Sequence, residues 1–523
     1  KSLFIANADN NCLAVFDVAK PGFSQSKGFI PTGWYPTNVK VIGRTIYVAN
    51  GKGLSSAPNP YGPNPVQKNE EVVYQHGDSS KPTKVQYIGG LFRGSLSMIP
   101  IPSAKTLAAY SRQVYQNTPY SKKKETTAWV EKGNPIPSGK GEKSPIKHVF
   151  YIIKENRTYD QVLGDMKEGN GDPSLVLFGE NITPNQHALA RQFVLLDNFY
   201  CNAEVSADGH NWSLGAYATD YLEKTWPTSY GGRGGHYDAE GNREIANNKG
   251  GFLWDNCRRA GVSYRTYGEF ADDYKPNIPV LKDHFCPYYT SWDQRVRDTT
   301  RFNQWRRDFD SLLAINKVPQ LNTLRLINDH TEGLSKGRPT PFAHVADNDL
   351  AVGMLIEYLS RSSIWKESAV FIVEDDAQNG ADHVDAHRTT AYVAGGFVKR
   401  AFVDHTMYAT TSMVRTIELI LGLPPMSQYD AAATPMWRCF SAKADLTPFK
   451  SLPSNVDLDN RNIAVNEWQR RSELFNLDKE DAVPDLEFNR VLWHGIKGDH
   501  VPFPAPKRAA FIKVKEEKEE DDD

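Results

Sequence analysis

The sequence predicts an α/β protein built on a mostly parallel sheet flanked by helices, preceded by a smaller all-β region. Residues 148–153 and 369–373 are apolar runs rich in β-branched and aromatic side chains, without alternation, as expected of strands buried on both faces. Between residues 147 and 492, strand-like and helical patterns alternate, which is typical of a mostly parallel sheet. The chain of 523 residues is too long for one simple core, so two or three domains are expected.

A repeat near the N-terminus predicts the β region. The tetrapeptide FIAN at 4–7 recurs as YVAN 43 residues later, at 47–50. A period of about 40–45 residues is typical of a four-stranded β-propeller blade, and the two copies resemble YVTN-type propeller repeats. Two blades cannot close a propeller, which needs about 4–8; we expect either further blades upstream of residue 1 or a different packing. The alternative is an ordinary β-meander.

Composition shifts divide the chain further. We expect a partial β-propeller over residues 1–100 and a linker over 101–146, where Pro, Gly and a Lys triplet at 122–124 indicate a solvated segment. The α/β domain should span residues 147–495, with an insertion or cap at about 225–329 that is rich in Gly, Tyr, Arg and Trp. Residues 496–523 form a C-terminal extension that ends in an acidic tail.

Bulk properties exclude several classes of function. A formal net charge of -2 gives no general field for nucleic acid, and no nucleic-acid partner is expected. The sequence contains no run of about 18 apolar residues, so it predicts no membrane-spanning helix. The five cysteines are scattered without a CxxC pair, so neither a zinc knuckle nor a disulfide scaffold is indicated. The chain opens directly into a strand-like stretch without a signal peptide, which suggests a processed or truncated start.

Oxygen-bearing side chains follow both buried runs. Lys154, Glu155 and Asn156 end the first run, and Glu374-Asp375-Asp376 ends the second. Because ligands collect beyond the carboxyl ends of the strands in an open α/β sheet, these side chains should meet at one edge. Such oxygen clusters suit a divalent cation and, through it, a phosphate. An all-oxygen set favours Ca²⁺, Mg²⁺ or Mn²⁺, whereas a histidine ligand would favour Zn²⁺.

The segment 204–213 offers a nucleophile. It lies between a strand-like stretch at 194–200 and a helix that starts near Asn211. A hydroxyl at this junction would lie beside a helix N-terminus, where free N–H groups and the dipole favour a phosphate oxygen. Ser206 is therefore a candidate nucleophile, activated by a metal rather than by a histidine base. The alternative is that Ser206 or Asp208 is a plain N-cap.

The segment 374–388 concentrates five carboxylates, His383, His387 and Arg388. The two histidines could ligate metal, protonate a leaving group or hold phosphate oxygens. A phosphate monoester needs additional positive charge, which Arg157, Arg388 or an arginine of the 225–329 segment could supply. A diester would favour an apolar wall instead. The residues leave monoester and diester cleavage open.

These segments carry a resemblance to a known family. The sequence HVFYIIKENRTYD at 148–160 resembles the opening motif of the bacterial phosphoesterase family, which holds phospholipase C-like enzymes and acid phosphatases of the alkaline phosphatase superfamily. Asp375-Asp376 with the later DHV at 382–384 is similar to a second signature, and TSMVRTIE at 411–418 to a third. The resemblance covers residues 147–435 approximately and implies an alkaline phosphatase-like fold.

The resemblance also implies roles for single residues. Metal ligands would be Glu155, Asn156, Asp375 and Asp376. A Ser or Thr nucleophile would fall in the segment that matches Ser206, and His383 would lie close to the phosphate. In related chains the nucleophile directly precedes a Pro-Asn pair. Counting back from Asn211 leads to Asp208, so Ser206 requires a small shift.

The expected function is metal-dependent hydrolysis of a phosphate ester through Ser206 and a phosphoserine intermediate. The developing charge would be bound by His210, Asn211 and His383, and the substrate by Arg157, His387 and Arg388. The substrate would be a phosphorylated small molecule or a lipid. The resemblance implies export to the periplasm or the cell surface. The alternative is a catalytically inactive surface scaffold that binds its partner through the propeller.

Overall fold

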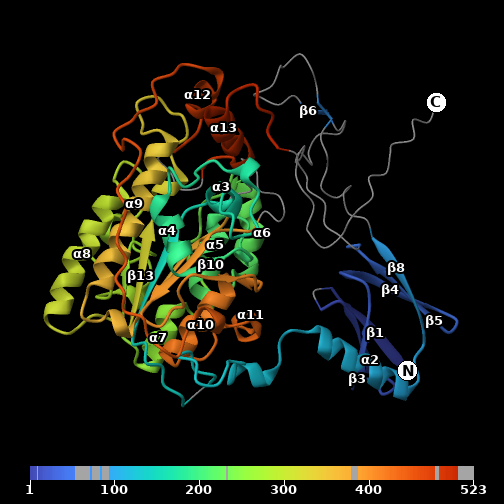
Figure 1. The fold of residues 1–523 in the computed structure, drawn as a ribbon. Helices are drawn as coiled ribbons and strands as arrows, with labels where there is room; N and C mark the ends of the chain where they lie inside the picture. The colour runs from blue at the N-terminus through green and yellow to red at the C-terminus, as the bar shows by residue number, and fades with distance from the viewer. Residues whose placement is uncertain are drawn as a thin grey trace. The chain divides into compact units, whose positions relative to one another are not determined.

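The computed structural model describes residues 1–8, 10–53, 71–72, 83–84, 94–139, 141–230, 234–377, 387–477 and 482–504. The described residues divide into two compact units, the first within Lys1–Ser121 and the second from Lys122 to residue 504 (Figure 1). Within the described residues, no helix combines the length and the apolar character that a membrane span requires.

The first unit contains two three-stranded antiparallel sheets. The first has the order β1-β2-β3 and the second the order β4-β5-β8. Their bounds are β1 Ser2–Asn7, β2 Cys12–Asp17, β3 Gln25–Pro31, β4 Pro36–Ile42, β5 Thr45–Asn50 and β8 Ser95–Pro100. The repeated tetrapeptides lie in β1 and β5. The propeller stays a prediction, because the described residues of this unit form two small sheets and a short pair, β6 (Glu71–Val72) with β7 (Thr83–Lys84).

Helix α2 (Ala104–Asn117) closes the free edge of the first sheet. Ser103 caps its N-terminus by accepting from the backbone N–H of Thr106. The Ser111 hydroxyl accepts a hydrogen bond from the backbone N–H of Phe29 in β3 at 2.9 Å. Leu107 lies in the same core as the apolar residues of both sheets. The amphipathic pattern at 103–115 is therefore a helix of the first unit.

The second unit is built on a five-stranded sheet of order β12-β13-β9-β14-β15. Strands β12, β13, β9 and β14 run parallel, and β15 pairs antiparallel with β14. Their bounds are β9 His148–Lys154, β12 Tyr264–Tyr267, β13 Leu321–Leu326, β14 Ser368–Glu374 and β15 Ala391–Gly395. Both apolar runs are central, buried strands, which confirms the predicted mostly parallel α/β sheet.

Helices cover both faces of this sheet. On one face, the ring of Trp305 in α8 lies 6.2 Å from Phe150 of β9. On the other face, the indole N–H of Trp254 in α7 donates to the hydroxyl of Thr323 in β13 at 3.1 Å. The helices of this unit are α3 Tyr159–Leu163, α4 Pro184–Gln192, α5 Ser206–Gly215, α6 Asp220–Tyr230, α7 Leu253–Ala260, α8 Asp298–Ala314, α9 Pro341–Ser360, α10 Thr410–Leu421, α11 Gln428–Ala432, α12 Glu467–Ser472 and α13 Asp485–Lys497.

Two short parallel pairs extend the strand content beside the main sheet. They join β10 (Val194–Leu196) to β16 (Phe402–Asp404) and β11 (Phe199–Tyr200) to β17 (Tyr408–Ala409). Strand β11 leads toward α5, and β17 leads directly into α10. These pairs fix the chain just before the helix that carries Ser206.

Two segments differ from the expected domain plan. Strands β12 and β13 fall within residues 225–329, so this segment supplies part of the main sheet rather than only a cover. Residues from Lys122 onward pack on the second unit instead of bridging as a linker. The amide of Asn134 donates to the carbonyl of Trp437 at 2.9 Å, and the Trp129 ring lies 4.9 Å from the Trp437 ring. The polar composition of this segment does not indicate these few contacts with the rest of the second unit.

Candidate active site

The carboxyl ends of β9 and β14 lie side by side. The register pairs Lys154 with Glu374, so the residues that follow each strand emerge at the same level. The backbone N–H of Asp375 donates to the carbonyl of Lys154 at 3.1 Å. Asn156 has φ of +60°, a left-handed conformation that asparagine tolerates better than most residues. The predicted meeting of the two acidic clusters at one sheet edge is therefore confirmed.

Ser206 lies in the first turn of α5 and faces these clusters. Its buried hydroxyl lies 2.9 Å from Asp376 Oδ2, 3.2 Å from Asn156 Oδ1 and 3.3 Å from Glu155 Oε2. The alternative of a plain cap at residue 206 does not hold, because Val205 is the N-cap residue. The carboxylate of Asp208 accepts from the backbone N–H groups of Glu204 and Val205 at 3.2 and 3.0 Å. Asp208 therefore caps the helix, and the Ser206 hydroxyl is left to the cluster.

Helix α5 approaches the end of β14 very closely at Gly209. A Cβ atom at this position would lie 2.8 Å from the backbone oxygen of Asp375 and 2.9 Å from its carbonyl carbon. Both are backbone atoms that cannot swing away as a flexible side chain would. Glycine at position 209 thus allows the helix to bring Ser206 against the acidic cluster.

The donor set fits a divalent cation. The Asn156 amide atom that faces the cluster lies 2.9 Å from Asp375 Oδ1, 3.2 Å from Glu155 Oε2 and 3.3 Å from Asp376 Oδ2. The amide has two orientations: its nitrogen can donate to these carboxylates, or its oxygen can join them around a cation. The buried Oδ2 of Asp375 has no hydrogen-bond partner among the described residues. Glu155, His210 and Asp375 also offer ligand atoms within 4.8 Å of one another. These carboxylate and amide oxygens suit a hard cation such as Ca²⁺ or Mg²⁺.

A second layer of charges surrounds Glu155. Arg325 of β13 lies 2.7 Å from Glu155 Oε1 and 2.8 Å from Glu240 Oε2. The imidazole of His210 lies between two carboxylates, with Nε2 3.2 Å from Glu155 Oε1 and Nδ1 3.0 Å from Glu269 Oε2. One oxygen of Glu155 therefore meets Arg325 and His210, while the other faces Ser206.

This layer sets the ionisation of the cluster. Burial raises the pKa of Glu155, but Arg325 and His210 outweigh burial and lower the pKa to about 2. Burial, together with the charges of Glu155 and Asp376, raises the pKa of Asp375 well above its ordinary value. Burial lowers the pKa of His210, but Glu269 and Glu240 raise it well above the ordinary range. A cation next to Asp375 would favour its ionised form.

Sequence reasoning missed Arg325, Glu240 and Glu269. All three lie in the 225–329 segment, which the sequence predicts to be an insertion or cap. The signal that could have found Arg325 is its place one residue before the end of the strand-like stretch LNTLRL, in the sheet neighbour of β9. The polar residues Asn322 and Thr323 obscured that strand.

Several predicted substrate contacts lie elsewhere. Arg157 is buried and donates to the backbone carbonyls of Asp329 and His330, both at 2.7 Å. Arg388 donates to the carbonyls of Asp197 and Asn170 at 2.8 Å each. Both guanidinium groups therefore brace loops, which sequence alone does not show because their partners are backbone atoms far along the chain.

The remaining predicted residues are Asn211, His387 and His383. Asn211 donates to the carbonyl of Ala246 at 3.1 Å, on another side of α5 from the Ser206 contacts. His387 lies 3.1 Å from Glu204 Oε1, close to the start of α5. His383 lies outside the described residues. The structure thus brings together Glu155, Asn156, Ser206, His210, Asp375 and Asp376.

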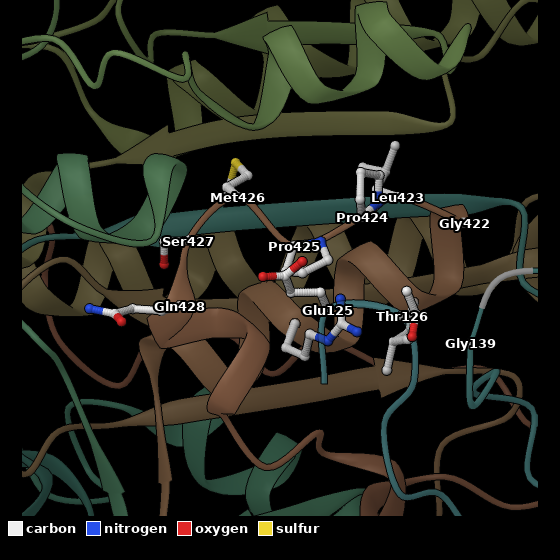
Figure 2. A pocket seen from close by; sticks show the side chains of 12 residues that line it. Glu125, Thr126, Gly139, Gly422, Leu423, Pro424, Pro425, Met426, Ser427 and Gln428 are labelled. Carbon is white, nitrogen blue, oxygen red and sulfur yellow. The ribbon is translucent and has the colours of Figure 1, made fainter. Parts of the chain in front are cut away.

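A separate cavity of about 620 Å³ lies beside the C-terminal end of α10. Figure 2 shows Glu125 and Thr126, from the segment that precedes β9, next to residues 422–428 that follow α10. None of the predicted site residues lines this cavity. Its wall includes Arg415, which is paired with Glu418 at 3.2 Å.

Comparison with known proteins adds a family match. Residues 171–424 match the model of the Phosphoesterase family, a range that includes Ser206, His210, Asp375 and Asp376. A comparison with curated proteins finds no match.

Among solved structures, the chain is similar to a protein in the alkaline phosphatase superfamily from Vibrio parahaemolyticus, at 15% identity and a TM-score of 0.40, covering 59% of this chain and 75% of that one. It is also similar to the lipoteichoic acid synthase LtaP from Listeria monocytogenes, at 12% identity and a TM-score of 0.38, with 72% and 97% covered. Human ectonucleotide pyrophosphatase/phosphodiesterase 5 matches at 12% identity and a TM-score of 0.33, with 57% and 100% covered.

Proposed function

We propose that this chain is a metal-dependent hydrolase of phosphate esters that uses Ser206 as its nucleophile. The observation that carries the proposal is the position of the Ser206 hydroxyl, in the first turn of α5 and within 3.3 Å of oxygen atoms of Asp376, Asn156 and Glu155. The family match over residues 171–424 supports the class of reaction.

Four residues would hold the cation: Glu155, Asn156, Asp375 and Asp376. A divalent cation bound there supplies positive charge that lowers the pKa of a neighbouring hydroxyl and neutralises a phosphate oxygen. Arg325 and His210 act behind these residues, since both contact the Glu155 oxygen that points away from Ser206. They position Glu155 rather than touch the substrate.

The reaction would proceed in two displacements at phosphorus. The Ser206 hydroxyl would pass its proton to Asp376 Oδ2, 2.9 Å away, as its oxygen attacks phosphorus in line with the leaving alkoxide. The alkoxide takes a proton from solvent, and Asp376 returns its proton to the Ser206 oxygen when the phosphoserine is cleaved. The N-terminus of α5 would favour the negative charge of the phosphoryl group through the helix dipole. Water then cleaves the phosphoserine, releasing phosphate or a phosphate monoester and restoring the hydroxyl.

The test is hydrolysis of p-nitrophenyl phosphate and bis-p-nitrophenyl phosphate, with and without EDTA. We expect turnover that EDTA abolishes, that returns on addition of a divalent cation, and that Ser206→Ala reduces by about 10³-fold or more. Ser229→Ala, in the neighbouring helix α6, is the matched control and should retain activity. The preferred ester decides between phosphatase and phosphodiesterase.

Two results would overturn this function. Undiminished activity in Ser206→Ala would assign the nucleophile elsewhere. Failure of every divalent cation to support turnover of either ester, together with no cation-dependent change in melting temperature, would favour the inactive scaffold. A phosphorylated small molecule or lipid as substrate, and location in the periplasm or at the cell surface, are proposals that rest on the resemblance alone.

A further inference from the structure

The two sheets of the first unit pack against each other through different faces, which we call the front face of the first sheet and the back face of the second. We define the front face of the first sheet by Phe4, Ala6, Leu13 and Val15, which the strand register places together. The back face of the second sheet is defined by Ile46 and Val48 of β5. These residues form one apolar core, in which Leu13, Ile46 and Val48 are fully buried. The contact therefore joins two different kinds of face.

The 43-residue repeat identifies the counterpart of the back face on the first sheet. It places Leu3 and Ile5 of β1 at the positions of Ile46 and Val48 of β5. Ile46 and Val48 are each 0% exposed, whereas Leu3 is 46% and Ile5 41% exposed. The same positions are thus buried in the second sheet and open to solvent in the first.

The strand register identifies the counterpart of the front face on the second sheet. Phe4 pairs with Val15 as its counterpart Tyr47 pairs with Met98, and Ala6 pairs with Leu13 as Ala49 pairs with Leu96. Leu13 and Val15 are 0% and 4% exposed, whereas Leu96 and Met98 are 60% and 66% exposed. Among the described residues, the counterparts of both halves of the internal contact are thus exposed, Leu3 and Ile5 on the first sheet and Leu96 and Met98 on the second.

We propose that the front face at Leu96 and Met98 docks on the back face at Leu3 and Ile5 of a second copy of this chain. The internal contact between the two sheets shows that such faces fit each other, and exposed apolar patches of this kind mark interaction surfaces. Because the two faces differ, the contact is head to tail and closes into a ring where the rotation permits.

The experiment measures the mass of the full chain by light scattering over a wide range of concentrations. We expect a multiple of 58.7 kDa for the unmodified chain. The pair Leu96→Glu with Met98→Glu, and the pair Leu3→Glu with Ile5→Glu, should each give monomers. Phe23→Glu is the control, because Phe23 is 62% exposed in the loop between β2 and β3 and lies on neither face.

Mixing the two Glu variants tests the head-to-tail geometry directly. Each variant retains one intact face, so an equimolar mixture should form a dimer and stop there. A monomeric unmodified chain at every concentration, or a mixture that stays monomeric, would overturn the proposal. If either Glu pair unfolds, as shown by circular dichroism, Leu96→Ala with Met98→Ala replaces it and should weaken association by about tenfold or more. Unchanged association in that folded Ala variant would equally overturn it.

Discussion

Lys154 and Glu374 face each other across neighbouring parallel strands and form a fully buried ion pair, with 2.7 Å between Nζ and Oε1. Lys154 also lies 2.7 Å from Asp329 Oδ2. This group lies directly beneath the acidic cluster, since Glu155 and Asp375 are the next residues along each strand. The ion pair fixes the relative level of β9 and β14 and, with it, the level of the residues proposed to bind the cation.

Replacing Lys154 by Met should destabilise the fold by about 3–5 kcal/mol, because two carboxylates would remain buried without a positive partner. Urea unfolding followed by circular dichroism measures this change. The double variant Lys154→Met with Glu374→Gln should recover part of the loss. If the single variant is as stable as the unmodified chain, the proposed bracing role of Lys154 is wrong.

Divalent cations should raise the melting temperature. A ligand that binds only the native state stabilises it by about 2.7 kcal/mol at roughly a hundredfold excess over Kd. Asp376→Asn should remove most of this gain, because it deletes a carboxylate from the cluster. Asp220→Asn is the control, since its side chain is 86% exposed and distant in sequence from both clusters. Equal cation responses in the two variants would place the cation elsewhere.

Arg325→Gln should weaken cation binding by about tenfold to a hundredfold, because residues that orient metal ligands typically contribute this much to affinity. Titration calorimetry with the cation is the measurement. Arg265→Gln is matched to it: Arg265 lies on the adjacent strand β12 and pairs with Asp308 at 2.6 Å. That control should lose stability without losing cation affinity. Partial recovery of cation affinity in Arg325→Lys would show how much of the effect comes from the positive charge of Arg325 and how much from the shape of its guanidinium group.

Stability should fall with acid because of His330. Burial lowers the pKa of this histidine to about 4, below its ordinary value of 6.5, so the native state favours the neutral ring. The contribution is fully present above pH 6.5 and is lost as the pH falls through 4, up to about 3 kcal/mol. His330→Gln should flatten this part of the pH dependence, measured by urea unfolding at several pH values. Parallel curves for the two proteins would contradict the assignment.

Gly209→Ala should reduce activity and destabilise the fold by about 1–3 kcal/mol, because the added methyl group would force α5 away from Asp375. Gly250→Ala provides the comparison, since a Cβ there meets nothing within 4 Å. Activity and thermal melts of both variants decide the point. A neutral Gly209→Ala would mean that α5 can shift without moving Ser206.

The parts of the fold that the sequence predicted are those where one physical signal dominates. Strands β9 and β14 are uninterrupted apolar runs, and the residues that follow them reach one sheet edge because parallel strands share a direction. The segment 204–213 was expected to lead into a helix near Asn211, and α5 begins five residues earlier, at Ser206 itself. In each case the evidence lies within a few residues of the site.

The parts that were missed depend on partners far along the chain. Strand β13 is fully buried, yet it contains Asn322, whose amide donates to the carbonyl of Pro319 at 2.9 Å. It also contains Arg325, whose charge is met by Glu155 and Glu240. The sequence shows the positive charge of Arg157 and Arg388, but it does not show the loop carbonyls to which they donate. A polar residue in a sequence does not show whether its partner is a substrate or the protein itself.

The cap at Asp208 makes the chemistry at position 206 exchangeable. Since the carboxylate of Asp208 caps the first turn of α5, the side chain at 206 can be varied without a change in that cap. Threonine or cysteine at this position would place a different nucleophile against an unaltered scaffold. The site is therefore suited to protein engineering, in which the reacting atom is chosen separately from the architecture that presents it.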